Sequence, residues 1–407
     1  MWEKIVILVT SIVLQANCLD LEVLNQWNLF EFNFPYDNAL ITAFRPENTV
    51  FTGLEITDDR IFVSMPRLWS GVPATLATIP RNMPPGSSPV LQVYPDWSFH
   101  SAGRGNVSSC SELVSVYRIR QDSCNRLWVL DSGIMTSLED FRVVCPPKII
   151  IFDLKTDRIV RTVVFPRQVL RPNSLLTNLV IDESVQGSCD SAFAYISDTA
   201  SPGLVIYNSM QDTAWRLIHP SMYPDPNFSD HTIAGETFTL MDGVVGLAHS
   251  PKLATLYFQP LATNRIFSIR TAELRKGPPA TNEVLPIELV GKKSSQGLGL
   301  TVDERDDTLY FSPLTETSLA SWNPLTSRQS LISYNPDLLQ FLAEIRWNKR
   351  DGNIYMISTR FQKFFRRSLS SNEINLRIIR VRTKSSISSA FNNNNLYFNK
   401  PHTFLPN

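Results

Sequence analysis

The stretch Cys124-Asn-Arg-Leu-Trp-Val-Leu-Asp-Ser-Gly133 combines a tight turn, a short apolar strand and a polar exit. The runs around it, at 113–120, 148–153 and 158–165, are rich in β-branched and aromatic residues and are separated by Asp, Ser, Asn or Pro. Short runs of this composition with such breaks are typical of strands rather than helices. The region therefore predicts a meander of antiparallel strands.

The same unit recurs six times along the chain. In each copy a polar turn precedes three residues with an aromatic ring at the centre, and successive rings stand 45 to 67 residues apart. These rings belong to Phe62, Trp128, Tyr195, Tyr257, Tyr310 and Tyr355. Repetition of a small antiparallel sheet at this period indicates a β-propeller. We predict an all-β fold, a six-bladed propeller of four-stranded blades. A β-sandwich is the alternative, but it does not require the repeat.

The last repeat contains only three recognisable strands, at 342–347, 354–358 and 376–381. Near the start of the chain, residues 24–34 alternate apolar and polar side chains and read as an isolated strand. We expect this N-terminal strand to complete the last blade and close the ring, because closure removes exposed strand edges. The predicted propeller domain spans residues 19–382.

Both ends of the chain differ from the repeats. Lys4 precedes an apolar run at 5–14 and then Gln-Ala-Asn-Cys, which predicts a signal peptide over residues 1–18. Ten apolar residues are too few to span a bilayer. A retained anchor is the alternative. With no other long apolar stretch, we expect a secreted, extracellular protein. Residues 383–407 are rich in Ser and Asn and predict a disordered tail.

Composition limits the partners and cofactors. The chain carries 38 Lys and Arg against 38 Asp and Glu, so there is no basic excess to bind nucleic acid. It contains no phosphate-binding glycine loop, no His-Glu-x-x-His and no Cys-x-x-Cys. Its five histidines are scattered, without the spacing of metal ligands. We predict no cofactor and no metal site from these motifs; whether the channel holds a metal ion stays open, as does the oligomeric state.

Four cysteines remain after the predicted signal peptide, and four cysteines allow three pairings. Cys110 and Cys145 begin the first and third strands of one blade, so both lie at the same end of the meander. Cys124 and Cys189 lie in first-to-second-strand turns of adjacent blades, at the opposite end. We predict Cys110–Cys145 and Cys124–Cys189, each contributing about 4 kcal/mol by the loop-entropy account. Four free thiols, the alternative, do not fit a secreted protein.

Two sequons agree with export. Asn106-Val-Ser and Asn227-Phe-Ser match the acceptor pattern for N-glycosylation, and each lies in a polar or Pro-rich segment. Such segments are expected on the surface, where a glycan can be attached. Asn106 and Asn227 are therefore predicted glycosylation sites.

Polar residues follow several of the predicted second strands. Asp131 and Asp198 end two of these strands. Asn264 and Thr315 lie in loops beyond two others, and Phe361 follows the last. Loops after second strands and connections into first strands meet at one mouth of a propeller, a concave place for a ligand. Carboxylates beside an aromatic ring suit a small aromatic amine. Alternatively, both aspartates only accept backbone hydrogen bonds in their turns, and Phe361 plugs the channel.

Six segments together resemble the yellow / major royal jelly protein family of insects. They are residues 110–120, 126–133, 145–157, 194–198, 235–238 and 358–362. The likeness runs from about residue 22 to about residue 382. The resemblance implies a secreted six-bladed propeller with a role near melanin formation and cuticle pigmentation. Other roles in the family are conversion of dopachrome, binding of biogenic amines by salivary relatives, and nutrition or signalling by royal jelly relatives.

The resemblance also implies two ligand-binding positions. In the amine-binding relatives a Ser-Asn-Arg-Phe-like motif contributes to the pocket, and this chain reads Ser358-Thr359-Arg360-Phe361. Phe361 matches the motif, whereas Thr359 stands where an amide is common. Thr359 and Phe361 are thus implied ligand contacts, and the threonine departs from the pattern for amine binding.

Three functions remain as hypotheses. The protein binds or isomerises catechol-derived intermediates such as dopachrome, or it binds biogenic amines without turnover, or it is a structural, nutritive or signalling glycoprotein. An isomerase of dopachrome needs only a proton transfer, which a positioned carboxylate performs as a general base. We expect Asp131 or Asp198 to be that base if the protein is an enzyme.

Overall fold

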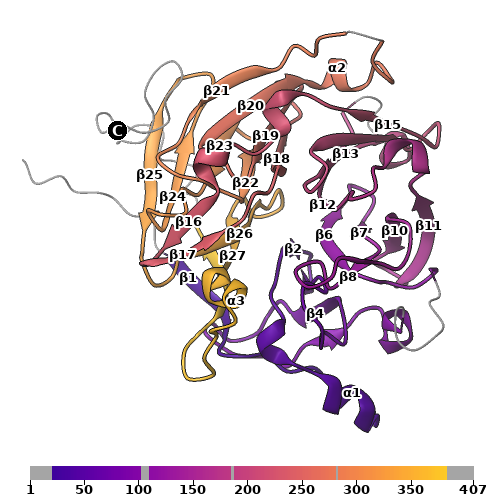
Figure 1. Cartoon of the computed structure of the whole chain (residues 1–407), viewed down its shortest axis with the longest axis vertical. Helices are drawn as coiled ribbons and strands as arrows, with labels where there is room; N and C mark the ends of the chain where they lie inside the picture. Colours follow the sequence, from indigo (N-terminus) through magenta and orange to yellow (C-terminus); the bar gives the residue numbers. More distant parts are fainter. Residues whose placement is uncertain (1–20, 102–109, 185–187, 281–282, 383–407) are drawn as a thin grey trace, which may run out of the picture.

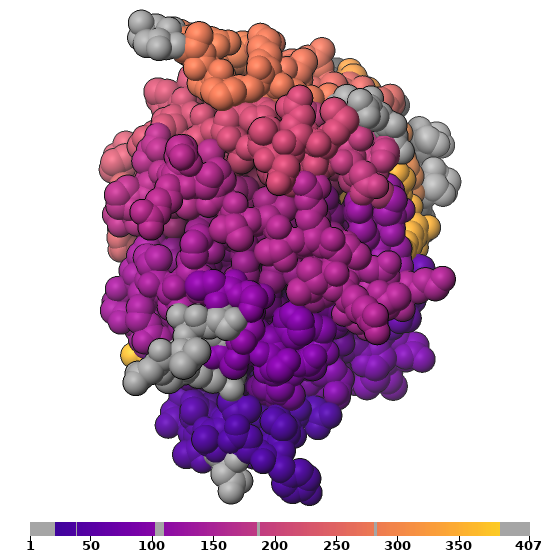
Figure 2. Space-filling view, turned by 90° about the vertical axis from the view of Figure 1, so that its right-hand side faces the viewer, coloured from indigo at the N-terminus to yellow at the C-terminus, as the bar shows by residue number. Residues whose placement is uncertain are grey.

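The computed structural model describes residues 21–101, 110–184, 188–280 and 283–382. The predicted signal peptide, the predicted tail and the Asn106 sequon lie outside the described residues. Six four-stranded antiparallel sheets are arranged as a ring (Figure 1). This is the predicted six-bladed β-propeller. On the face shown in Figure 2 the chain runs in sequence order, from indigo at the bottom to orange at the top.

Each blade is a meander whose first strand is innermost. The first three blades are β2 (Gly53–Ile56), β3 (Arg60–Ser64), β4 (Leu76–Pro80) and β5 (Gln92–Val93); β6 (Val116–Gln121), β7 (Arg126–Asp131), β10 (Lys148–Asp153) and β11 (Arg158–Val164); and β12 (Leu176–Asp182), β13 (Phe193–Asp198), β14 (Gly203–Asn208) and β15 (Thr213–Leu217). The last three are β18 (Val244–Ser250), β19 (Thr255–Pro260), β20 (Arg265–Arg270) and β21 (Glu288–Lys292); β22 (Leu300–Asp303), β23 (Thr308–Phe311), β24 (Ser318–Trp322) and β25 (Gln329–Tyr334); and β26 (Phe341–Trp347), β27 (Ile354–Thr359), β28 (Leu376–Val381) and β1 (Leu21–Trp27).

Short elements lie outside the blades. They are the hairpins β8 (Ile134–Met135) with β9 (Arg142–Val143) and β16 (Asp230–Ile233) with β17 (Glu236–Thr239), the helices α1 (Asn38–Ala43), α2 (Thr271–Leu274) and α3 (Phe361–Phe365), and the 3-10 turns η1 (Pro46–Asn48), η2 (Trp97–His100), η3 (Arg167–Val169), η4 (Cys189–Ser191), η5 (Pro220–Met222) and η6 (Pro226–Phe228). Among the described residues no helix has the length and apolar character needed to cross a membrane.

The repeated aromatic residue stands on the second strand of every blade and is buried. In three blades its polar atom donates a hydrogen bond to an aspartate in or near the preceding turn. Trp128 Nε1 lies 2.9 Å from Asp122 Oδ2, and the Tyr195 hydroxyl lies 2.5 Å from Asp182 Oδ2. The Tyr355 hydroxyl likewise lies 2.6 Å from Asp351 Oδ2. In these three blades the turn acid satisfies a buried donor of the ring.

The ring closes as predicted, through an N-terminal strand in the last blade. β1 pairs antiparallel with β28, from Leu21 opposite Val381 to Trp27 opposite Leu376. The predicted bounds of 24–34 were wrong, because the strand ends at Trp27. The alternating apolar residues after Trp27 do not continue the strand. Phe30 and Phe32 turn into the core, where the Phe30 ring stacks on Phe51 at 5.0 Å.

Both disulfides join the predicted partners. Cys110 pairs with Cys145, with Cα atoms 5.6 Å apart, and Cys124 pairs with Cys189, with Cα atoms 6.0 Å apart. The first bond ties the segment before β6 to the segment before β10. The second ties the β6–β7 turn of the second blade to η4 of the third. The meander geometry was therefore sufficient to choose among the three pairings.

Candidate functional site

Aromatic side chains fill the end of the channel at which the first strands begin. The ring of Phe361, the first residue of α3, stacks on Phe341 of β26 with centroids 4.6 Å apart. Phe238 of β17 packs edge-on against Phe361 at 5.7 Å. Figure 1 shows β17 and α3 close together beside the sixth blade. We call this end, with the β16–β17 hairpin and α3 packed over it, the covered mouth.

The opposite end of the channel is a charged cavity of about 620 Å³. It is lined by the last residues of the first strands and by the turns that follow them, including Glu55, Arg120, Val180, Ala248 and Arg346. We call this end the open mouth. The sequence argument placed the ligand site at the other end, so this larger cavity was not anticipated.

Asp131, predicted as a candidate base, is fully buried. Its carboxylate accepts hydrogen bonds from the backbone N–H groups of Val114 and Ser115, each at 2.8 Å, and from that of Gly133 at 3.0 Å. Lys148 Nζ lies 2.8 Å from Asp131 Oδ2. Burial alone would raise the pKa of Asp131, but Lys148 and these N–H groups outweigh it and hold the pKa below its usual value. The carboxylate thus holds the start of β6 against the end of β7.

Asp198, the other candidate base, has a similar environment in the next blade. It is fully buried, and Arg216 Nη1 lies 2.9 Å from its Oδ2. Its Oδ1 accepts hydrogen bonds from the backbone N–H groups of Leu175 and Ser201. These contacts support the alternative weighed from the sequence, in which both aspartates organise their turns.

The four predicted ligand positions do not form one cluster. Asn264 uses its side chain to donate to the Lys293 carbonyl at 3.2 Å, which ties two loops of the fourth blade together. Thr359 is buried, and its hydroxyl has no hydrogen-bond partner among the described residues. Phe361 belongs to the aromatic group at the covered mouth, as described above. Thr315 is exposed and lies in a separate pocket.

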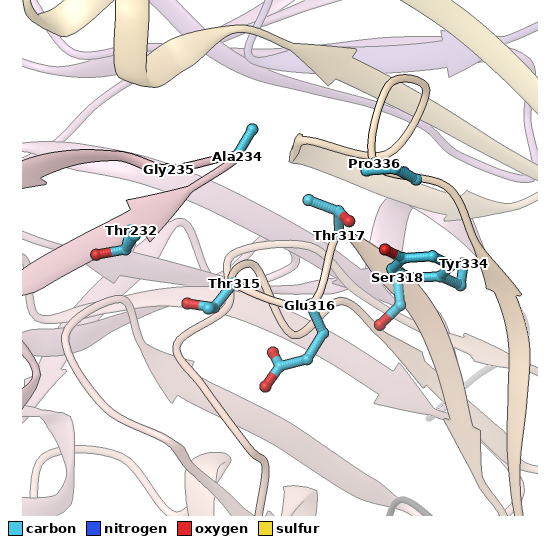
Figure 3. Close-up of a pocket in the computed structure, with 9 residues that line it drawn as sticks. All are labelled: Thr232, Ala234, Gly235, Thr315, Glu316, Thr317, Ser318, Tyr334 and Pro336. Atoms are coloured by element: carbon cyan, nitrogen blue, oxygen red, sulfur yellow. The ribbon is translucent and has the colours of Figure 1, made fainter.

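That pocket, of about 450 Å³, lies at the tip of the β16–β17 hairpin (Figure 3). Figure 3 shows Thr232 on one side and Tyr334 with Ser318 on the other, with Glu316 between them. Glu316 Oε2 accepts a hydrogen bond from the Ser295 hydroxyl at 2.5 Å, and that hydroxyl also accepts from the Thr315 N–H. A carboxylate, hydroxyl groups and a tyrosine ring therefore share one small pocket.

A carboxylate that sequence reasoning missed lies close to the covered mouth. Asp242 is half-buried in the connection from β17 into β18, and burial raises its pKa to about 6. It lies near enough to Tyr117, at the start of β6, for its charge to raise the pKa of that phenol further. The Tyr117 hydroxyl is 2.8 Å from Ser137 Oγ, in the loop after β8. Asp242 has no ion-pair partner among the described residues.

A signal for Asp242 was present in the sequence. It stands two residues before the buried first strand of the fourth blade, in one of the connections expected to reach the mouth. The aspartates after second strands were predicted as bases instead, because the turns that follow second strands are easier to recognise in the sequence. The expected gathering of loops does occur, since Ser137 follows a second strand and Asp242 precedes a first strand.

Metal ligands do not gather anywhere in the described part of the chain, where no group of three or more His, Cys, Asp or Glu side chains is placed to hold an ion. The residues near the covered mouth instead offer a carboxylate, hydroxyl groups and aromatic rings. Such a set can hold a flat ring, donate hydrogen bonds and accept a proton.

Comparison with known proteins settles the family. The model of the family described as "Major royal jelly protein" matches residues 114–390. The chain belongs to the major royal jelly protein family. Within this family, dopaminechrome tautomerase of Drosophila melanogaster is 32% identical over 93% of this chain and 86% of its own. Major royal jelly protein 9 of Apis mellifera is 30% identical over 88% of this chain and 86% of its own. Protein yellow of Drosophila erecta is 30% identical over 86% of this chain and 67% of its own.

Membership of the major royal jelly protein family agrees with the resemblance seen in the sequence. The matched range begins at the first strand of the second blade and continues through β28. It therefore includes Tyr117, Asp242 and Phe361, three residues near the covered mouth.

Proposed function

We propose that the protein is secreted and acts in pigmentation by binding, and isomerising, catechol-derived aminochromes at the covered mouth. The observation that carries this proposal is the 32% identity, over 93% of the chain, to a dopaminechrome tautomerase. Secretion is supported by the signal-like residues 1–18 and by two disulfides, which persist in oxidising compartments.

Asp242 is the base in this proposal. Isomerisation of an aminochrome removes one proton from each of the two saturated carbons of the five-membered ring and adds one proton to each of the two quinone oxygens. The electrons of the two broken C–H bonds enter the ring system, so a dihydroxyindole forms without any net oxidation. A general base works best when its pKa lies near the working pH. The pKa of about 6 at Asp242 meets this condition.

Neighbouring side chains supply the other requirements. The hydrogen-bonded hydroxyls of Tyr117 and Ser137 are positioned to donate to a ring oxygen that gains negative charge. Phe361, Phe341 and Phe238 offer aromatic faces and edges for a flat ligand. Asp131 and Asp198 stay predictions as bases, but their buried contacts favour Asp242 over either of them.

The first test is the decay of dopaminechrome and dopachrome absorbance with purified, disulfide-intact protein. Heat-denatured protein is the control, because both compounds rearrange spontaneously. We expect decay that is proportional to protein concentration and that saturates with substrate. Equal rates with native and denatured protein would contradict catalysis. Comparing the two substrates, which differ by one carboxylate, also shows whether that group is recognised.

Binding of a biogenic amine without turnover is the second candidate function. The hairpin pocket supports it, because Glu316 can pair with an ammonium group and Tyr334 offers a ring face. Calorimetric titration with serotonin and dopamine tests this candidate. Saturable binding that Glu316→Gln abolishes, together with no acceleration of aminochrome decay, would favour the binder over the enzyme.

A further inference from the structure

Three arginines converge in the middle of the channel, away from the covered mouth. Arg118 and Arg120 stand on β6, and Arg346 stands on β26. The side chains of Arg118 and Arg120 are 4% and 3% exposed, and that of Arg346 is 22% exposed. We call these three residues the channel arginines. They are unusual because a buried guanidinium group is costly unless an anion compensates it.

Two glutamates face the channel arginines. Glu344 pairs with both Arg118 and Arg120, and the Arg120 Nη2 atom lies 3.1 Å from Glu344 Oε1. Glu55 Oε2 pairs with Arg346 Nη2 at 2.9 Å and also accepts from the backbone N–H of Gln121. Three guanidinium groups therefore share two carboxylates, which leaves a net charge of +1 among these five described side chains.

Most of the charges around the rim of the open mouth pair with one another. Glu183 is the one carboxylate lining the cavity that has no cationic partner among the described residues, so it partly offsets the charge inside the channel. The rim pairs are Asp122 with Arg126, Glu304 with Lys349, and Asp58 with Arg350. Glu183 accepts hydrogen bonds from the backbone and hydroxyl of Ser123. His249 lies 3.6 Å from Asp182, which also pairs with Arg275.

The channel arginines also retain unused hydrogen-bonding capacity. The Nε atoms of all three are buried and have no hydrogen-bond partner among the described residues. The groups repel one another as well. Burial is the larger cause and the charge of Arg346 the smaller one, and together they lower the pKa of Arg118 to about 9. The same causes lower the pKa of Arg120. An additional anion would relieve this repulsion and could accept the unused donors.

The open-mouth cavity gives such an anion space. Its volume of about 620 Å³ is in the range of small-molecule sites, and Arg120 and Arg346 both line it. Val180 and Leu247 contribute apolar surface to the same cavity. We propose that the open mouth binds a small organic monocarboxylate, with its carboxylate between Arg120 and Arg346 and its apolar body against Val180 and Leu247. This site is separate from the covered mouth and does not depend on the function proposed there.

Calorimetry on the full-length, disulfide-intact protein tests this proposal. Benzoate is the probe, and benzamide is its neutral counterpart of nearly the same shape. We expect benzoate to bind with one-to-one stoichiometry and benzamide to bind at least tenfold more weakly. Equal heats for the two compounds, or no saturable heat from benzoate, would overturn the proposal.

Two variants change the charge balance in opposite directions. Arg346→Gln removes the excess charge and should weaken benzoate binding at least tenfold. Glu55→Gln increases the excess and should tighten binding several-fold, so it decides the question if Arg346→Gln does not fold. Arg161→Gln, on β11 and paired with Asp212 outside the cavity, is the matched control and should leave the affinity unchanged. Equal affinities in Glu55→Gln and the native protein would contradict the assignment.

Chloride provides a separate arm of the experiment. The titrations are made in chloride-free buffer and then repeated with added sodium chloride. Affinity that falls only by ordinary ionic screening supports a carboxylate site. Full competition by chloride at equal concentration would assign the channel arginines to a halide ion and overturn the carboxylate assignment.

Discussion

Acidic side chains inside the channel near the open mouth form ion pairs, whereas an acidic side chain near the covered mouth forms none with the described residues. In the interior near the open mouth, Glu344 and Glu55 each pair with an arginine. Near the covered mouth, Asp242 has no ion-pair partner among the described residues, and burial raises its pKa to about 6. An acid that stabilises a fold keeps its partners, whereas an acid without partners is costly to the fold. The comparison separates structural carboxylates from one that is suited to chemistry.

The largest effect is expected for aminochrome turnover in Asp242→Asn. Loss of a general base should lower the rate by roughly 10²–10⁴-fold. Asp230→Asn, at an exposed aspartate on the base of the hairpin, is the matched control and should retain full activity. Stopped-flow absorbance measures both. Native rates in Asp242→Asn would remove Asp242 from the proposed mechanism.

Asp131→Asn should instead reduce stability. The substitution leaves the buried Lys148 ammonium group without the carboxylate that pairs with it. Breaking a buried ion pair typically lowers the free energy of unfolding by about 3–5 kcal/mol. Urea unfolding of the disulfide-intact protein measures the loss, and turnover by the remaining folded protein should stay near native. If the folded variant were inactive, Asp131 would have the catalytic role that the sequence suggested.

The free energy of unfolding should depend on pH through Asp242. It should fall as the pH rises, whereas an acid paired in the folded state would make it rise. Its folded pKa of about 6 lies above the ordinary value of 3.8, so ionisation opposes folding. Its favourable contribution is complete below about pH 4 and is lost as the pH rises through 6. Asp242→Asn should therefore gain roughly 3 kcal/mol of stability at pH 7 and far less at pH 4. Thermal melts at both values check this, and an equal gain at pH 4 would exclude the cause given.

The smallest effect concerns the aromatic group at the covered mouth. Phe361→Leu keeps an apolar side chain but removes the ring that stacks on Phe341. Ring contacts contribute about 0.5–1.5 kcal/mol, so affinity for an aromatic ligand should fall by about three- to tenfold. Tyr36→Ala, at a fully exposed aromatic residue, is the control. Fluorescence titration with dopamine measures both variants, and unchanged affinity would place the ligand elsewhere.

The fold could be predicted because its signals are local and repeated. A polar turn followed by a buried ring recurs at six second strands, and the ring closure followed from counting strands in the last repeat. The disulfides followed because alternate strands of a meander start at the same end. The strand bounds near Phe30 could not be predicted, because alternating aromatics suit a core cluster as well as a sheet.

The site was harder to predict because it depends on partners that are distant in sequence. Asp131 and Asp242 are both aspartates beside a strand, and the sequence does not show that Lys148 reaches only the first. The excess charge in the channel depends on pairs such as Arg120 with Glu344, which are more than two hundred residues apart. Position within a repeat could be read from the sequence, but the balance of charge at that position could not.

The pairing of β1 with β28 sets an order of assembly. Leu21 pairs with Val381 and Glu22 forms an ion pair with Arg380, so the sixth blade needs residues from nearly opposite ends of the chain. During synthesis the first strand to emerge must wait, unpaired, until the other five blades have been made. Such long-range pairing slows folding and leaves an edge exposed meanwhile. The same hydrogen bonds that make the ring stable are thus the last to form, and that interval is when the chain most needs protection from aggregation.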